Sequence, residues 1–167
     1  MSPRPSIPAT LVVSPELLID SNLLLLLIMG SFNTSLIGTF KRLAMFTKED
    51  FSFLQILVAQ CKTIIVTPHI LTEVSNLANS LPHRQKEEWS IFFREWIVKA
   101  LEERQIGAVE IAASNAFLYF GITDAAMFHA STEVSVLTID ARLAAYLQSQ
   151  DRNVINFNHL RQAWLFS

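Results

Sequence analysis

An aspartate interrupts a strongly apolar stretch near the start of the chain. Residues 17–30 read LLIDSNLLLLLIMG, so Asp20 has apolar residues on both sides. A buried carboxylate is costly unless it is hydrogen-bonded, paired with a charge or bound to a cation. The pattern predicts a short buried strand, Leu17–Ile19, that passes into a helix from Ser21 to about Met29, with Asp20 at the junction.

The composition limits what such an apolar chain can be. The chain has 167 residues, 51% of them hydrophobic, and its mean hydropathy is +0.34. The longest apolar run in the opening stretch, Leu23–Met29, is far shorter than the roughly 20 residues that a bilayer requires. The chain shows no signal-peptide pattern. We therefore expect a soluble cytoplasmic protein with no membrane span, a loose arm over residues 1–15 and a single domain over residues 16–167.

The charge balance and the single cysteine exclude other classes of protein. A net charge of −2, from 13 basic and 15 acidic residues, argues against a broad basic surface that coats nucleic acid. Cys61 cannot form an internal disulfide, and no thiolate zinc pattern exists. The four histidines show no metal-ligand spacing, and His129 is expected to be structural or on the surface. The carboxylates are therefore the candidate ligands.

Short β-branched segments alternate with helical patterns along the chain. Clear strands are predicted at 17–19, 63–67, 134–139 and 153–157, and a weak one at 108–113. Helices are predicted at 21–29, 35–46, 50–60, 69–81, 83–105, 114–121, 123–132, 141–150 and 159–166. This alternation predicts a three-layer α/β/α fold with a central, mainly parallel sheet covered on both faces.

Four acids lie at or soon after predicted strand ends or at a helix start. Asp20 and Asp140 each follow a strand, Glu73 lies early in the helix after the second strand, and Asp124 begins a later helix. Ligands of parallel sheets bind beyond the carboxyl ends of the strands. Four carboxylates in one cleft repel one another and require protons or cations at neutral pH. Mg²⁺ and Mn²⁺ prefer such oxygen ligands.

Each of these positions also has an ordinary structural explanation. Asp20 and Asp140 precede helices, where aspartate is a favoured N-cap. Asp124 suits a first helical turn because of the helix dipole, and Glu73 suits a solvated helix face. Asn22 either orients the first acid or caps the helix start. Four independent coincidences at one edge are a weaker explanation than one shared site.

Four segments together resemble the PIN-domain family of metal-dependent ribonucleases: LLIDSNLLL, VTPHILTEVSNL, GITDAAMFHAS and VSVLTIDARLAAYL. In that family an aspartate ends the first strand, and a glutamate lies on the helix after the second. Another aspartate opens a later helix in a TDA-like context, and a last one follows a VLTxD strand. The matching positions here are Asp20, Glu73, Asp124 and Asp140. The resemblance covers roughly residues 17–157, while the long segment 81–107 and the N-terminal arm depart from compact members.

The resemblance implies hydrolysis of RNA phosphodiester bonds with one or two Mg²⁺ or Mn²⁺ ions. Asp20, Asp124 and Asp140 would be metal ligands, and Glu73 would hold a metal-bound water or complete a second metal site. Asn22 and Thr138 would be supporting groups.

The resemblance also implies partners. Many bacterial members are toxins held inactive by a small antitoxin protein, and many form homodimers. Arg142, close to Asp140, is expected to contact RNA, with an ordinary solvated charge as the alternative. The stripe Trp89–Ile97 fits either an interface or core packing. The alternative function is a catalytically silent PIN-like module that binds protein or RNA.

Overall fold

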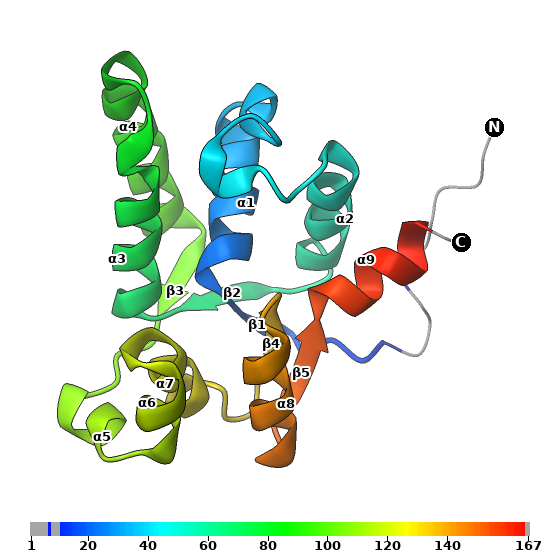
Figure 1. Ribbon diagram of the computed structural model, residues 1–167, viewed down its shortest axis with the longest axis vertical. Coiled ribbons are helices and arrows are strands. Elements are labelled where there is room, and N and C mark those ends of the chain that lie inside the picture. Colours follow the sequence, from blue (N-terminus) through cyan, green and yellow to red (C-terminus); the bar gives the residue numbers. More distant parts are fainter. Residues whose placement is uncertain (1–6, 8–10, 166–167) are drawn as a thin grey trace.

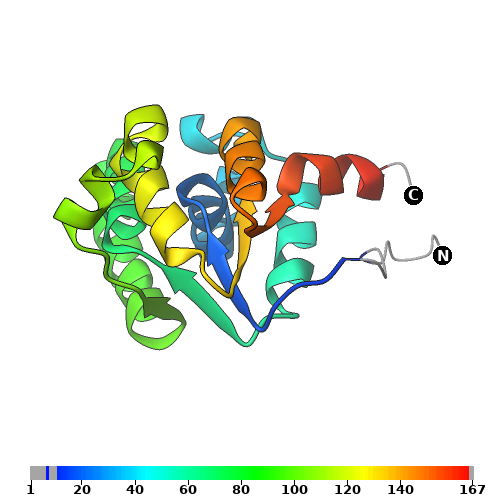
Figure 2. The same ribbon diagram turned by 90° about the horizontal axis from the view of Figure 1, so that it is seen from below.

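Five parallel strands form the centre of the molecule. The computed structural model describes Ile7 and residues 11–165 (Figures 1 and 2). The strand order is β3-β2-β1-β4-β5, and every neighbouring pair is parallel. The strands are β1 (Glu16–Ile19), β2 (Thr63–Val66), β3 (Leu101–Glu103), β4 (Ser135–Thr138) and β5 (Asn153–Asn156). The predicted parallel α/β fold is confirmed.

Helices cover both faces of this sheet (Figure 1). One layer contains α1 (Ser21–Phe32), α2 (Lys48–Val58), α3 (Pro68–Leu77) and α4 (His83–Lys99). The other layer contains α5 (Ala108–Ala112), α6 (Asn115–Phe120), α7 (Ile122–Ala130) and α8 (Ala141–Ser149). Helix α9 (Phe157–Leu165) follows β5 and packs on α2, where Phe53 stacks on Phe157.

Helix α1 lies inside the helical layer rather than on its surface. Every side chain from Leu23 to Met29 is at most 3% exposed, because α2, α3 and α4 surround the helix. A helix that is apolar all round is expected to be buried in this way. Of the helices that the structure describes, none is long and apolar enough to span a membrane.

The prediction of a helix at 35–46 is wrong. The segment instead forms two short 3₁₀ turns, η1 (Thr34–Leu36) and η2 (Lys41–Leu43). Between them Gly38 has a φ of +80°, a left-handed conformation that glycine adopts without strain. The Gly38 N–H donates a hydrogen bond to the Leu43 carbonyl, which folds the segment back on itself. The apolar spacing therefore marks side chains that reach the core from turns.

Two further predictions around α4 are corrected. The helix predicted over 83–105 ends at Lys99, and Leu101–Glu103 forms the edge strand β3 beside β2. The weak strand predicted at 108–113 is instead helix α5. Both errors concern short segments, in which apolar residues do not distinguish a strand from a helix.

Aromatic residues of α4 belong largely to the core. Trp89 and Phe93 are 4% and 7% exposed and stack on each other with ring centroids 5.4 Å apart. Core packing, one of the two explanations of the stripe, therefore applies to both rings. Ile91 and Val98 on the same helix are exposed.

Most of the predicted loose arm, residues 1–6 and 8–10, lies outside the described residues. The described part contacts the domain: Ile7, Leu11 and Val13 pack against the core. Ser14 and Ser135 also exchange two hydrogen bonds of 2.8 and 2.9 Å between backbone N–H groups and hydroxyls. The end of this segment is therefore fixed beside β4.

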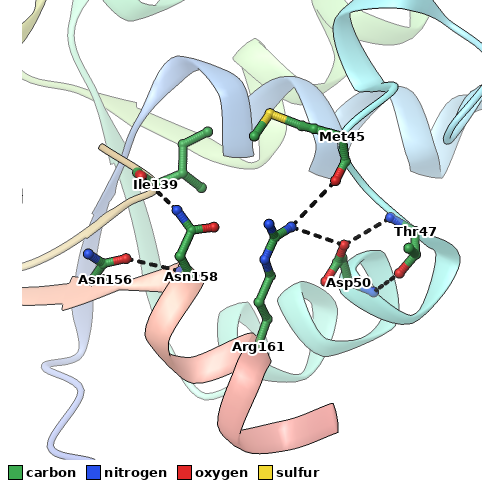
Figure 3. Close-up of polar contacts among 7 residues, drawn as sticks. All are labelled: Met45, Thr47, Asp50, Ile139, Asn156, Asn158 and Arg161. Atoms are coloured by element: carbon green, nitrogen blue, oxygen red, sulfur yellow. Dashed lines mark hydrogen bonds and ion pairs between the residues drawn. The ribbon is translucent and has the colours of Figure 1, made fainter. Parts of the chain in front are cut away.

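A buried ion pair joins α9 to the start of α2 (Figure 3). The Asp50 carboxylate accepts the Thr47 N–H at 2.9 Å, completing a capping box. It also accepts Arg161 Nη1 at 3.3 Å, and the same nitrogen donates to the Met45 carbonyl at 3.5 Å. The Asp50 side chain is 4% exposed, so loss of either partner leaves a largely buried charge without its counterion.

We expect Asp50→Ala to lower the free energy of unfolding by about 2–3 kcal/mol, because it removes a cap and isolates Arg161. Urea denaturation followed by circular dichroism measures this change. A matched control is Glu95→Ala, which breaks the exposed pair with Lys99 on α4 and should leave stability almost unchanged. Equal effects of the two substitutions would contradict a special role for the buried pair.

Candidate functional site

The order in which the chain adds strands to the sheet changes direction between β1 and β4. Strands β2 and β3 lie on the side of β1, and β5 lies on the side of β4. The helix after β1 lies in one layer, and the helix after β4 lies in the other (Figure 1). Such a switch point leaves a crevice beyond the carboxyl ends of the two strands, where α/β proteins bind ligands. Asp20 follows β1 directly, and Asp140 follows β4 after one residue, Ile139.

Asp20 is held by both strands at this point. Its backbone N–H donates to the Leu137 carbonyl at 3.0 Å, which extends the contact between β1 and β4. Its Oδ1 accepts the Leu23 N–H at 2.9 Å and caps α1, and its Oδ2 accepts the Ile139 N–H at 2.8 Å. The capping alternative for Asp20 is therefore correct as a local structure, and the carboxylate is fixed in orientation.

These hydrogen bonds offset only part of the cost of burying Asp20. Burial raises the pKa of Asp20, while hydrogen bonds from the Leu23 N–H, the Thr138 hydroxyl and the Ile139 N–H lower it. The nearby Glu73 carboxylate raises the pKa further. The net shift is upward, which means that these hydrogen bonds do not fully offset the burial of the charge.

Glu73 reaches the same region from the second turn of α3. Its Oε2 accepts a hydrogen bond from the Ser21 hydroxyl at 2.8 Å. Ser21 is buried and is adjacent to Asp20 in the chain. The residue that positions Glu73 is therefore Ser21. The expected supporting residue Asn22 is exposed and makes no side-chain hydrogen bond within the described part of the chain.

Asp124 lies in the first turn of α7 and faces the other three acids. Burial, followed by the charges of Asp140, Asp20 and Glu73, raises its pKa to about 7. Within residues 11–165 its carboxylate accepts no hydrogen bond. The four acids that the sequence pattern singled out are thus close enough in space to repel one another.

Asp140 is the most exposed of the four. Its Oδ1 accepts the N–H groups of Arg142 and Leu143 at 2.8 and 3.0 Å, so the N-cap alternative is also correct as a local structure. Thr138 is fully buried between the two strand-end acids. Its hydroxyl donates to Asp20 and accepts the Asp140 N–H at 3.0 Å. Thr138 therefore links the two aspartates.

The basic residue nearest in sequence to Asp140 points elsewhere. The Arg142 guanidinium lies over the Phe120 ring, 5.6 Å from its centroid, and Arg142 is exposed. A cation over an aromatic face is a favourable contact. Within the described chain the guanidinium makes this contact and no ion pair.

A residue that the sequence reasoning missed supports the site from α9. Asn158 donates from Nδ2 to the Ile139 carbonyl at 2.9 Å, and its N–H donates to Asn156 Oδ1 at 3.0 Å (Figure 3). The N–H of the same residue, Ile139, donates to the Asp20 carboxylate. Because Asn158 is 138 residues from Asp20 in the chain, no local sequence pattern marks this connection.

The acids suit a hard divalent cation in chemistry but do not form a ready ligand set. Across the described residues, no three His, Cys, Asp or Glu side chains are grouped so that they could hold a metal ion. The donor type nevertheless fits Mg²⁺ or Mn²⁺, because all four groups are carboxylates and their repulsion raises the pKa of Asp124. A bound cation would relieve that repulsion.

A cavity of about 420 Å³ reaches the cluster from the side of α3. Its lining includes Glu73 and Thr123, the neighbour of Asp124. Pro68, His69 and Ile122 also line it. Of the four acids, Glu73 is therefore accessible to a ligand that approaches along α3.

Comparison with known proteins leaves the relationship open: no family model matches the chain, and neither a curated protein nor a solved structure is significantly similar to it.

Proposed function

We propose that the protein is an endoribonuclease that depends on Mg²⁺ or Mn²⁺. The observation that carries the proposal is that Asp124 lies close enough to Asp140, Asp20 and Glu73, beyond the ends of β1 and β4, for their charges to add to burial in raising its pKa. These acids come from four separate parts of the chain and include one whose pKa is raised to about 7. The order and context of the same acids support the resemblance to PIN-domain ribonucleases.

The residues of the site have distinct roles in this proposal. Asp20, Asp124, Asp140 and Glu73 would hold the metal, and a bound metal would lower the pKa of its water and neutralise charge on phosphate oxygens. Thr138 and the Ile139 N–H keep the Asp20 carboxylate in one orientation. Ser21 does the same for Glu73. Asn22 and Arg142 remain proposed contacts for a water or an RNA phosphate.

The direct test is RNA cleavage by the purified protein with Mn²⁺, beside an Asp20→Asn variant. We expect cleavage by the wild type that stops with EDTA and returns with added Mn²⁺. Asp20→Asn should lower the rate by at least about 100-fold, since it removes a charge at the reacting centre. Gel electrophoresis of an end-labelled RNA measures both rates.

Asp151→Asn is the matched control for this test. Asp151 is exposed and has a φ of 57°, a left-handed conformation that asparagine also tolerates. The control variant should cleave at the wild-type rate. Cleavage that survives both EDTA and Asp20→Asn would exclude the proposed mechanism.

A catalytically silent module that binds RNA or protein is the second candidate. The observation in its favour is that the described acids do not form a ready-made metal site. Calorimetric titration separates the two, because a silent module should bind neither Mg²⁺ nor Mn²⁺ up to millimolar concentration. The small antitoxin protein, the homodimer and the cytoplasmic location remain predictions, to be checked by co-purification, size-exclusion chromatography and cell fractionation.

A further inference from the structure

A second groove lies beside the acidic cluster, between α3 and α4. Its volume is about 530 Å³, within the range of roughly 300–1,000 Å³ that ligand sites occupy. The two helices lie side by side at one end of their layer (Figure 1). None of the functional residues expected from the sequence lines this groove.

The floor of the groove is aromatic and rigid. Trp89 and Phe93 form it, and both are almost fully buried. Their rings stack on each other, and the Trp89 ring also contacts Phe32 of α1 edge-on at 5.8 Å. The two rings therefore fix the shape of the groove but expose little surface of their own to a ligand.

The walls of the groove are polar and positively charged. Asn76 and Asn79 contribute amide groups from the α3 side, and Ser90 contributes a hydroxyl from α4. Lys86 and Arg94 are the charged residues of the lining, and no described lining residue is acidic. Neither cation forms an ion pair inside the described chain. Eight residues separate them on α4, which corresponds to about 12 Å along the helix.

This groove is continuous with the acidic site. The cavity that contains Glu73 and the groove of α4 share two lining residues, Thr72 and Asn76. A chain that enters between α3 and α4 can therefore run along α3 to Glu73. Charge changes along this path, from two cations in the groove to the Glu73 carboxylate of the acidic cluster.

We propose that the groove between α3 and α4 binds a single-stranded segment of RNA next to the cleaved bond. This proposal rests on the proposed function, because it assigns the substrate to the same acidic site. The carboxylates repel a phosphate backbone, so affinity must come from cations elsewhere. Lys86 and Arg94 contact two phosphates, while the bases meet the amides and hydroxyls of the walls.

The test is binding of a fluorescein-labelled single-stranded RNA of about 12 nucleotides. Fluorescence anisotropy is measured in EDTA, so that binding is followed without cleavage. The groove variant carries Lys86→Gln and Arg94→Gln. The control carries Lys48→Gln and Lys62→Gln, an equal charge change at exposed lysines at the start of α2 and before β2.

We expect the groove variant to bind RNA about tenfold more weakly than the control. The slope of log affinity against log salt should fall by about 1.4, that is about 0.7 for each lost single-strand phosphate contact. Photocrosslinking of 4-thiouridine RNA to the wild type should label the tryptic peptide 87–94. Circular dichroism confirms that both variants are folded.

Two results would overturn the proposal that this groove binds RNA. If both variants bind RNA equally well while Mn²⁺-dependent cleavage is intact, the RNA lies elsewhere and the proposed function stands. If the wild type binds no RNA in EDTA, the groove has a different occupant, such as an acidic protein segment, and the cleavage assay then judges the proposed function separately.

Discussion

Replacing Asp124 by asparagine is expected to stabilise the fold at about pH 8 while lowering RNA cleavage at least about 100-fold. The gain in stability follows from the raised pKa of this carboxyl, and the loss of cleavage follows from removing a proposed metal ligand. Burial and the charges of Asp140, Asp20 and Glu73 raise this pKa from 3.8 to about 7. The protein keeps an unfavourable charge where the cation is expected to bind.

The sign of the pH dependence follows from the direction of this shift. Below about pH 4 the Asp124 carboxyl is protonated in both the folded and the unfolded chain. Between about pH 4 and pH 7 only the folded chain retains the proton, so the stability that this proton contributes is lost as the pH rises. The complete shift corresponds to at most about 4 kcal/mol.

We expect Asp124→Asn to raise the free energy of unfolding by about 2 kcal/mol at pH 8 and to change it little at pH 4. Urea denaturation in metal-free buffer at both pH values measures the two differences. Asp151→Asn, an exposed substitution of the same kind, should have no such pH-dependent effect. A gain in stability that is equal at both pH values would show that the four acids do not repel one another in the folded protein.

The sheet and most helices could be predicted because each strand is short, apolar and followed by a clear helix signal. TIIV and SVLT are examples, each buried at three or four of its residues and each followed by a capping residue. The edge strand Leu101–Glu103 carries no such signal. Two of its three residues are exposed glutamates, and its strand geometry comes from backbone hydrogen bonds to β2 rather than from its own side chains.

Local backbone geometry explains the other errors in the predicted fold. Helical spacing of apolar residues in 35–46 arises from turns, because Gly38 takes a left-handed conformation that the surrounding pattern does not reveal. Segment 108–113 is too short for its period to be measured. Only Ile111 of this segment is buried, so apolar residues alone do not show which side of the backbone faces the core.

In the candidate site too, local sequence features could be predicted and contacts between distant parts of the chain could not. The four acids were recognisable because each lies next to a strand end or a helix start, which a single sequence displays. The residues that position these acids could not be recognised in this way. The pattern favours Asn22 over the adjacent Ser21, because the side chain that reaches Glu73 depends on how α1 is rotated against α3. Asn158 acts across the fold from α9.

Addition of Mg²⁺ or Mn²⁺ is the second change with a large expected effect. A cation that binds only the folded protein should raise its stability by about 2.7 kcal/mol at 100 times its dissociation constant. For a chain of this size, that gain raises the melting temperature by about 5–10 °C. The gain should be larger at pH 8 than at pH 5.5, because Asp124, with a pKa of about 7, binds a proton at the lower pH.

Thermal unfolding with and without metal checks this expectation, with Na⁺ or K⁺ at equal ionic strength as the control for general screening. Asp124→Asn should reduce the metal-dependent gain even though it raises stability without metal, whereas Asp151→Asn should preserve it. This opposite pair of effects is specific to a carboxylate that both repels its neighbours and binds a cation. If Mg²⁺ and Mn²⁺ stabilise the wild type no more than Na⁺ does, the acids do not form a metal site, and the silent binding module becomes the better proposal.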